Sequence, residues 1–255
     1  MNALHTVSRS LRPLWGALAL LALWWLAWRA EVANPLLLPS PQATMLSLWE
    51  GMVNGDLWGD FLSTVQRTMA GFLIAAAVAI PLGIFLGSSE RLYRSLEFVI
   101  DFFRSTPASA LFPLFLVLFG VGEMAKILVA AFGAALVILF NVAYGVMNAR
   151  QTRLLAAQVM GAGKFQRLRD VMFWESLPQT FVGLRNGISL TLVIIIVAEM
   201  FIGSSDGLGH RLVEAQMLFR MPEMYAAIFA AGALGYGLNW ASLLVERRIV
   251  HWGGK

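Results

Sequence analysis

The segment ILVAAFGAALVILFNVAYGVM, Ile127–Met147, contains no charged side chain. Its length matches the roughly 20 apolar residues that a helix needs to cross the hydrocarbon core of a bilayer, which is about 30 Å thick. A strand or an ordinary core segment has no reason to stay apolar over this length. The segment therefore predicts a membrane-spanning helix, and this assignment decides the fold class.

The composition of the whole chain supports the membrane class. Of 255 residues, 58% are hydrophobic and only 13% are charged, whereas a soluble domain is about half apolar and about a quarter charged. So few charged side chains cannot cover the surface of a water-soluble globule. The absence of cysteine excludes disulfides, thiolate metal sites and cysteine nucleophiles.

Five other segments have a suitable length for a span: Leu14–Val32, Val65–Leu86, Leu96–Phe119, Leu184–Ile202 and Met224–Leu244. Leu96–Phe119 is unusual because it contains Asp101, Arg104 and Pro107. We expect its helix to break where Thr106 precedes Pro107. Because lipid tolerates neither a broken backbone nor an unpaired charge, this segment should face protein or a water-filled cavity. The predicted fold is all-α, a polytopic membrane helix bundle of about six transmembrane helices in a single domain over residues 1–255.

Basic side chains are divided unequally between the two sets of predicted loops. With the N-terminus inside, the loops on that side hold Arg9, Arg12, Arg91, Arg94, Arg150, Arg153, Lys164, Arg167, Arg169, Arg185, Arg247, Arg248 and Lys255. The opposite loops hold Arg29, Lys126, Arg211 and Arg220. By the positive-inside rule both termini are predicted to be cytoplasmic. This anchoring at the membrane surface accounts for the net charge of +4 without any binding of nucleic acid.

The longest predicted cytoplasmic loop is residues 150–184. We expect an amphipathic helix around Ala156 and Ala157, a break at Gly161–Gly163, a second short helix, and an end at Leu177–Pro178. Two short helices beneath a membrane domain suit docking on a cytoplasmic partner. Helices that rest on anionic lipid would show the same pattern, and the residues alone leave both interpretations open.

Motifs for catalysis or nucleotide binding are not found. Gly161-Ala162-Gly163-Lys164 lacks the first glycine and the hydroxyl residue of a phosphate-binding P-loop, so we expect no ATP to be bound by this chain. His5, His210 and His251 do not have the spacing of metal ligands. We therefore expect no cofactor, no metal and no enzymatic activity of the chain itself.

A few polar side chains within the predicted spans are candidates for the pore or its gate: Arg104, Ser105, Thr106, Asn141, Ser189 and Glu199. Asp101 and Arg104 are three residues apart, so they either pair with each other or leave Arg104 to line the pore. Glu199 ends a span, where exposure to water is the simpler expectation. Ser189 has a hydroxyl that suits either the pore or a backbone carbonyl, and Asn141 suits a bridge between helices.

Two pairs of glycines four residues apart lie within the predicted spans. Gly83 and Gly87 form one pair, and Gly183 and Gly187 form the other. Such pairs allow close contact between membrane helices, although single glycines are also common there. The spacing alone does not choose between these interpretations.

The long loop also resembles a known family. Leu155-Ala156-Ala157 followed by Gly161, and later by Leu177-Pro178, is similar to the EAA loop of bacterial ABC importer permeases. Leu155 occupies the position of the usual glutamate, so no role of that glutamate is transferred. Other segments look like the nitrate/sulfonate/taurine (NitT/TauT) branch: residues 38–41, Arg67 with Gly71-Phe72, residues 81–87, 104–107, 112–114, 119–123, 198–200, 207–209 and 246–252.

This resemblance implies a type I ABC importer permease fold and transport by alternating access. It implies that the loop contacts a cytoplasmic ABC ATPase dimer, which would hydrolyse the ATP, through Ala156, Ala157, Gly161, Gly163, Leu177 and Pro178. The other implied partners are a periplasmic or lipid-anchored solute-binding protein, a second copy of the chain and membrane lipid. The solute would be small and polar or anionic, such as a sulfonate, taurine or nitrate, and the location the bacterial inner membrane. The alternative is an ion-gradient-driven secondary transporter or channel, which needs no docking loop.

Overall fold

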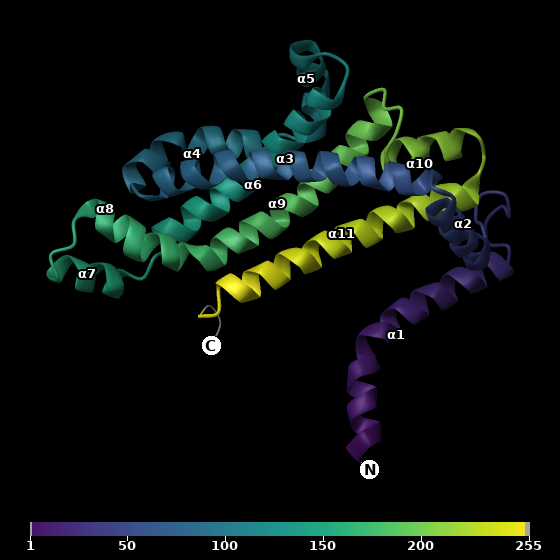
Figure 1. Ribbon diagram of the computed structural model, residues 1–255, viewed down its shortest axis with the longest axis horizontal. Coiled ribbons are helices and arrows are strands. Elements are labelled where there is room, and N and C mark those ends of the chain that lie inside the picture. Colours follow the sequence, from purple (N-terminus) through teal and green to yellow (C-terminus); the bar gives the residue numbers. More distant parts are fainter. Residues whose placement is uncertain (1, 253–255) are drawn as a thin grey trace.

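The computed structural model describes residues 2–252, with side chains from residue 15 onward. Over these residues the chain is all-helical, as expected (Figure 1). The elements are α1 (Asn2–Arg29), α2 (Pro41–Asn54), α3 (Asp56–Gly87), α4 (Glu90–Ser105), η1 (Ala108–Leu111), α5 (Phe112–Phe119), α6 (Glu123–Met147), α7 (Gln151–Val159), α8 (Lys164–Arg167), η2 (Leu168–Met172), α9 (Phe173–Phe201), α10 (Leu208–Met217) and α11 (Met221–Ile249). The side chains of His5, Arg9, Arg12 and Leu14, and Lys255 as a whole, lie outside the described part.

Four helices are long and apolar enough to cross a membrane: Asp56–Gly87, Glu123–Met147, Lys164–Phe201 and Met221–Ile249. A fifth span exists if α4 and the η1–α5 segment are counted together. These two halves meet at an angle of 87°, and α4 ends at Ser105, which confirms the predicted break before Pro107. The expected first span, Leu14–Val32, lies largely in α1, whose side chains are described only from residue 15 onward.

Helix α6 forms the centre of the bundle, between α3 and α9 (Figure 1). A β-carbon added at Gly87 of α3 would lie 2.6 Å from the carbonyl oxygen of Ala143, and one added at Gly183 of α9 would lie 2.6 Å from the β-carbon of Asn141. A β-carbon added at Gly83 or at Gly187 would lie 2.7 Å from a side-chain atom of α6. Both glycine pairs are therefore helix interfaces, and small residues let the backbones approach.

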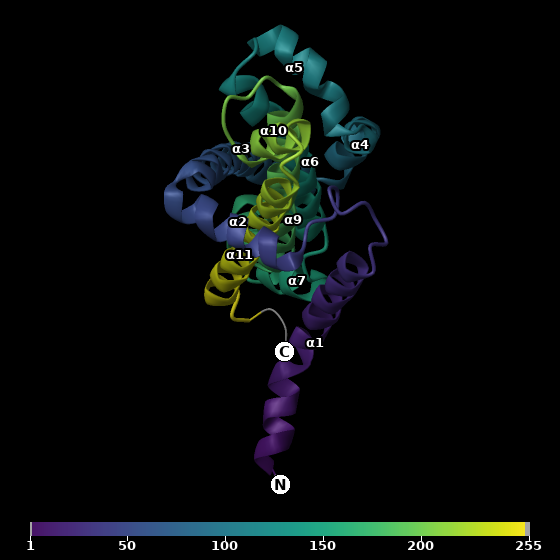
Figure 2. The ribbon, with the colours of Figure 1, turned by 90° about the vertical axis from the view of Figure 1, so that its right-hand side faces the viewer.

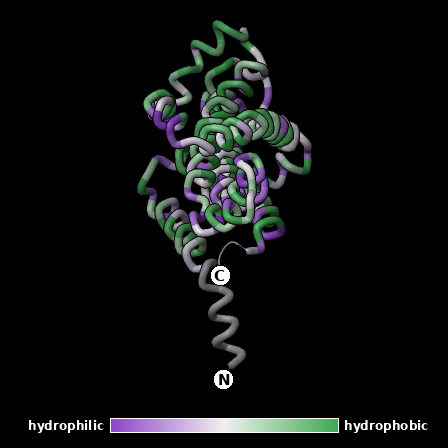
Figure 3. The backbone as a smooth tube through the Cα atoms, turned by 90° about the vertical axis from the view of Figure 1, so that its left-hand side faces the viewer, coloured by the Kyte–Doolittle hydropathy of each residue, from purple (hydrophilic) through white to green (hydrophobic). Residues whose placement is uncertain are grey.

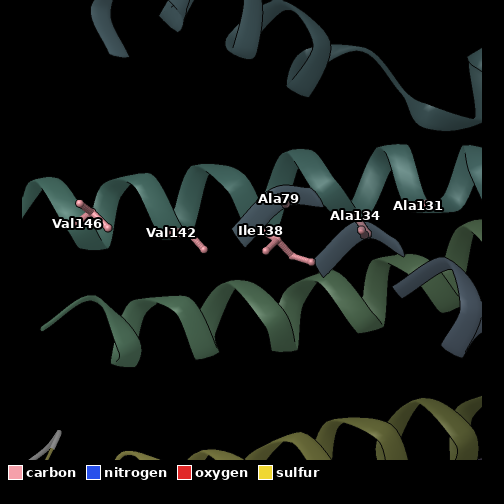
Figure 4. Close-up of a cluster of buried hydrophobic side chains, with 7 residues drawn as sticks. Ala79, Ala131, Ala134, Ile138, Val142 and Val146 are labelled. Carbon is pink, nitrogen blue, oxygen red and sulfur yellow. The ribbon is translucent and has the colours of Figure 1, made fainter. Parts of the chain in front are cut away.

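Beside these glycines, small and β-branched side chains fill the space around α6 (Figure 4). The buried cluster consists of Ala75, Ala79, Ala131, Ala134, Ile138, Val142 and Val146. Its members come from α3 and α6 and are almost completely shielded from the outside. The close packing leaves no room for a larger side chain at this interface.

The α3–α6 contact leads to a stability prediction. Gly87→Leu should lower the free energy of unfolding by about 1–3 kcal/mol, because the new side chain would force the two helix backbones apart. Gly59→Leu is the matched control on the same helix, since a β-carbon there meets nothing within 4 Å. The measurement is the midpoint of thermal unfolding in detergent. Equal midpoints for both variants would contradict the close packing.

The bundle has two distinct ends along its long axis. Helices α7 and α8 lie at one end, and α2 and α10 lie at the other (Figure 1). Val250 packs against Leu177 and Phe181, so the end of α11 lies beside the first turns of α9. The short helix α5 protrudes at one side of the bundle (Figure 2), packs through Phe112 against α6 and α9, and is hydrophobic along its length (Figure 3).

Candidate functional site

The predicted coupling loop contains a compact turn, which we call the elbow (Gln151–Arg167). Helix α7 ends at Val159, and Gly161 then adopts a φ of 86°, as its position in the predicted break requires. The amide of Ala162 donates to the carbonyl of Ala157 at 2.9 Å, and Gln166 accepts from the amide of Gly163 at 2.8 Å. The left-handed conformation favours glycine because it has no β-carbon, so Gly161 determines the direction in which α8 leaves α7.

The second short helix of the loop is not a separate element. Helix α8 continues through the π-helical segment η2 into α9, and Pro178 lies inside α9. The expectation that Leu177–Pro178 ends the element is therefore wrong. Leu177 is buried against Phe181 and Val250, and this tertiary packing outweighs the roughly 3 kcal/mol that an internal proline costs a helix.

The tip of the elbow exposes large apolar side chains. Val159 is 88% exposed, Met160 80% and Phe165 72%. Of the residues proposed for coupling, Ala156, Gly161 and Gly163 are also exposed, whereas Ala157 and Leu177 are buried. Ala157 is buried within the elbow, whereas Leu177 lies outside it and packs on Phe181 and Val250. A cluster of exposed apolar side chains of this kind is typical of an interaction site.

Glu175, near the start of α9, holds α7 in place. Its carboxylate accepts a hydrogen bond from Arg153 and lies 3.7 Å from the guanidinium of Arg150. Gln158 and Arg167 add a 3.0 Å hydrogen bond across the elbow. The first turns of α7 are thus tied to a helix that runs the full length of the bundle. Sequence reasoning missed Glu175, although an acidic residue within a strongly basic loop was a signal.

The expected Asp101–Arg104 pair is present but loose. The two charged groups are 3.7 Å apart and their side chains are 54% and 40% exposed. The guanidinium of Arg104 lies over the ring of Phe140, 4.2 Å from its centroid. Arg104 and Thr106 together line a cavity of about 320 Å³. Ser105 lies between them and is exposed.

The other hydroxyl and amide candidates make contacts between or within helices. Asn141 of α6 accepts a 2.8 Å hydrogen bond from the side chain of Gln179 on α9, which is the helix bridge that its position allowed. The hydroxyl of Ser189 donates to the carbonyl of Arg185 at 3.1 Å. Neither Asn141 nor Ser189 lines the cavity beside Arg104.

Glu199 is 1% exposed, so the expectation that it faces water is wrong. Arg67 of α3 donates to its carboxylate at 2.7 Å, the hydroxyl of Thr64 at 2.9 Å, and the amide of Gly209 at 3.0 Å. Helix α10 starts beside this carboxylate and covers it. The burial is tolerable because every oxygen is paired.

Arg67 is the centre of this charge network at the end of the bundle opposite the elbow. Besides Glu199, it bonds Glu123 of α6 and Asp206, which lies between α9 and α10. The Arg67 guanidinium holds the pKa of the Asp206 carboxyl below its usual range. Lys126 pairs with Glu123 at 3.0 Å. The network therefore joins α3, α6, α9 and the start of α10. The position of Arg67 inside an apolar span indicated that it needs partners, but the sequence did not show which residues these are.

Comparisons with solved structures and with protein families identify this architecture. The bundle matches a chain of the solved "Inward facing conformations of the MetNI methionine ABC transporter" with a TM-score of 0.69 at 20% identity, over 76% of this chain and 96% of that chain. The fold is thus that of a type I ABC importer permease. Residues 79–251 match the family "Binding-protein-dependent transport system inner membrane component", and the chain belongs to this family.

Individual relatives cover nearly the whole chain. The taurine transport system permease protein TauC of Escherichia coli (strain K12) is 29% identical over 94% of this chain and 89% of its own length. The riboflavin transport system permease protein RibX of Chloroflexus aurantiacus is 31% identical over 92% of this chain and 88% of its own. The chain is therefore a multi-pass permease subunit of an ABC importer, not an enzyme. Membership implies an ATPase subunit and a solute-binding protein as partners and the inner membrane as location, and it does not favour the ion-gradient alternative.

Proposed function

We propose that two copies of this chain form a permease that moves a small polar or anionic solute into the cytoplasm by alternating access. A solute-binding protein delivers the solute at the α2–α10 end, and a cytoplasmic ATPase dimer binds the two elbows and hydrolyses the ATP. This chain itself binds no ATP. Relatives named for taurine and for riboflavin are about equally similar, so the anionic class rests on Arg104 rather than on similarity.

The elbow is the observation that carries the proposed coupling role. Its apolar tip, Val159, Met160 and Phe165, lies at the end of the bundle rather than along its side (Figure 1). A lipid-resting helix would lie along the membrane surface with its apolar face towards the acyl chains. Because Glu175 ties α7 to α9, a push on the elbow from a partner reaches a membrane-spanning helix.

The charged face of α4 supports the homodimer. Five charged residues follow one another at intervals of three or four positions and are all exposed: Glu90, Arg94, Glu97, Asp101 and Arg104. Tyr93 and Ile100, which are buried against the rest of the bundle, lie beside this stripe on the helix rather than opposite it. A charged side chain at the centre of a membrane helix costs about 2.5–3.5 kcal/mol. This stripe therefore needs water or protein beside it, and a second copy around a water-filled path supplies both.

Purification tests the proposed assembly directly. Two differently tagged copies of the chain, expressed together with the ATPase subunit and the solute-binding protein, should purify as one complex with the ATPase. In proteoliposomes this complex should take up solute only with ATP and the binding protein. Recovery of single copies, or uptake driven by an ion gradient without the ATPase, would overturn the proposal.

The proposed orientation leads to a labelling prediction. The native chain contains no cysteine, so a single cysteine reports one position. Gln166→Cys in the elbow should resist a membrane-impermeant maleimide added outside intact cells and react once the membrane is opened. Asn54→Cys, at the other end of the bundle, is the matched control and should react from outside. Labelling of Gln166→Cys in intact cells would reject the orientation.

A further inference from the structure

We propose that the cavity beside Arg104 is a solute site that recognises a small amphiphilic anion, with Arg104 as its counter-charge. This inference rests on the proposed permease function and names the part of the path where the solute is held. It follows from the position of the cavity, from the distribution of polar and apolar groups in its wall, and from the unused hydrogen-bonding capacity of Arg104.

The cavity lies near the middle of the membrane-spanning bundle. It is lined by the α4–η1 break, by α6 and by α9. On α6 its wall runs from Phe132 to Val137, which is about 14–21 Å from the start of that helix at 1.5 Å per residue. The volume of about 320 Å³ is at the lower end of the range for small-molecule sites, about 300–1,000 Å³. A small solute at this depth would be held away from both surfaces.

The wall of the cavity has two chemically different parts. Arg104, Thr106 and Ser109 bring polar groups from the helix break. The rest is apolar, with Phe103, Phe132, Leu136, Leu190, Val193 and Ile194 among its members. A ligand that fits this wall has one anionic end and a compact apolar body.

Arg104 has donors to offer such an anion. A guanidinium carries five N–H donors, and among the described residues the ionic partner of Arg104 is Asp101 at 3.7 Å, longer than the usual 2.7–3.2 Å of a hydrogen bond. The guanidinium also lies over the ring of Phe140, a cation–π contact that uses no hydrogen-bond acceptor. An ionisable side chain at this depth in the membrane is energetically costly, and it is therefore a candidate for a functional site.

Arg67, in the same bundle, is an arginine whose hydrogen-bond donors are all paired. Its guanidinium contacts three carboxylates, those of Glu123, Glu199 and Asp206, and its side chain is 7% exposed. It has no capacity for a further anion. The contrast separates a structural cation from one that is available to a ligand.

Cysteine chemistry tests the site without a known solute. Ser109→Cys places a thiol in the cavity wall, and two methanethiosulfonate reagents of similar size serve as probes, one with a sulfonate and one with a trimethylammonium group. The protein is the purified permease–ATPase complex in nanodiscs. With Arg104 present, the ratio of sulfonate to ammonium reaction rates should be about tenfold higher than in the Arg104→Gln background, because a local positive charge concentrates anions. Val193→Cys on α9 repeats the measurement if Ser109→Cys assembles poorly.

Two further variants and a protection experiment test whether the charge effect comes from Arg104 and from an anion in the cavity. Arg94→Gln removes a charge from the same face of α4 but away from the cavity, and it should change the ratio less than twofold. Asp101→Asn removes the competing carboxylate and should raise the ratio. Benzenesulfonate should slow labelling at least fivefold with Arg104 and not with Gln at that position, whereas uncharged benzenesulfonamide should not protect. Equal effects of Arg94→Gln and Arg104→Gln, or equal protection by both compounds, would overturn the site.

The same preparation separates this inference from the proposed function. The stimulation of ATP hydrolysis by the binding protein reports the proposed permease function. This stimulation does not depend on a positive charge beside the thiol in the cavity. Intact stimulation with no charge selectivity rejects the anion site alone. A complex that never forms with the ATPase rejects the proposed function, while the reagent ratio still reports the site in the permease by itself.

Discussion

Gly161→Leu should leave the permease inserted and assembled as a dimer, and it should abolish the stimulation of ATP hydrolysis by the binding protein. The φ of 86° at Gly161 costs a residue with a β-carbon about 1 kcal/mol or more. A β-carbon at this position meets nothing within 4 Å in the chain itself. The folding penalty is therefore small, and a large loss of coupling must come from the redirected elbow or from a clash with the partner.

Gly55→Leu is a matched control for this prediction. Gly55 also has a positive φ, 96°, and open space at its β-carbon, but it lies between α2 and α3 at the opposite end of the bundle. The backbone strain is thus similar and only the location differs. The measurements are pull-down of the ATPase and stimulated hydrolysis in reconstituted vesicles. If Gly161→Leu retains both, or if Gly55→Leu loses both equally, the elbow is not the coupling element.

Arg67→Met should be the most destabilising single substitution that the charge network allows. It removes the cation that faces Glu123, Glu199 and Asp206. The carboxylate of Glu199 is completely buried, and breaking a buried ion pair by removing one partner costs about 3–5 kcal/mol. We expect little folded protein to be recovered in detergent, as measured by the monodisperse fraction and the unfolding midpoint.

Two companion variants identify the cause of this loss. Arg67→Met combined with Glu199→Gln should be more stable than Arg67→Met alone, because the second change removes the unpaired buried charge. Arg104→Met is the matched control within a span. Its pair with Asp101 is exposed, so its loss should cost no more than about 1 kcal/mol. A double variant as unstable as Arg67→Met would place the effect in side-chain shape rather than charge.

Features set by neighbouring residues were predictable from the sequence. The break at Thr106–Pro107 follows from the clash of the proline ring with the preceding residue, and the turn at Gly161 follows from a conformation that glycine adopts without cost. Both are present. The expectation that the helix ends at Leu177–Pro178 also rested on a local effect of proline. There the packing of Leu177 on Phe181 and Val250 outweighs that effect, and the helix continues.

The partners of the charged side chains were not predictable in this way. Arg67 and Glu199 are 132 positions apart, and Glu175 meets Arg153 from the other side of the elbow. A sequence shows that a charge lies in or beside a span, but not which helix will face it. This is why Glu199 was expected at the surface and Glu175 was not considered.

The sequence by itself determined the membrane class, the helical content and the elbow, because the length and polarity of a segment decide how it partitions between water and lipid before any tertiary contact forms. Only the tertiary structure decided the roles of Arg67 and Arg104, which both lie inside spans. Arg67 is enclosed by three carboxylates that three different parts of the chain bring together, whereas Arg104 faces a cavity with one loose partner. The physical reason is that the energy of a charge in a membrane depends on the groups around it in space, and the packing of α3, α6 and α9 sets those groups.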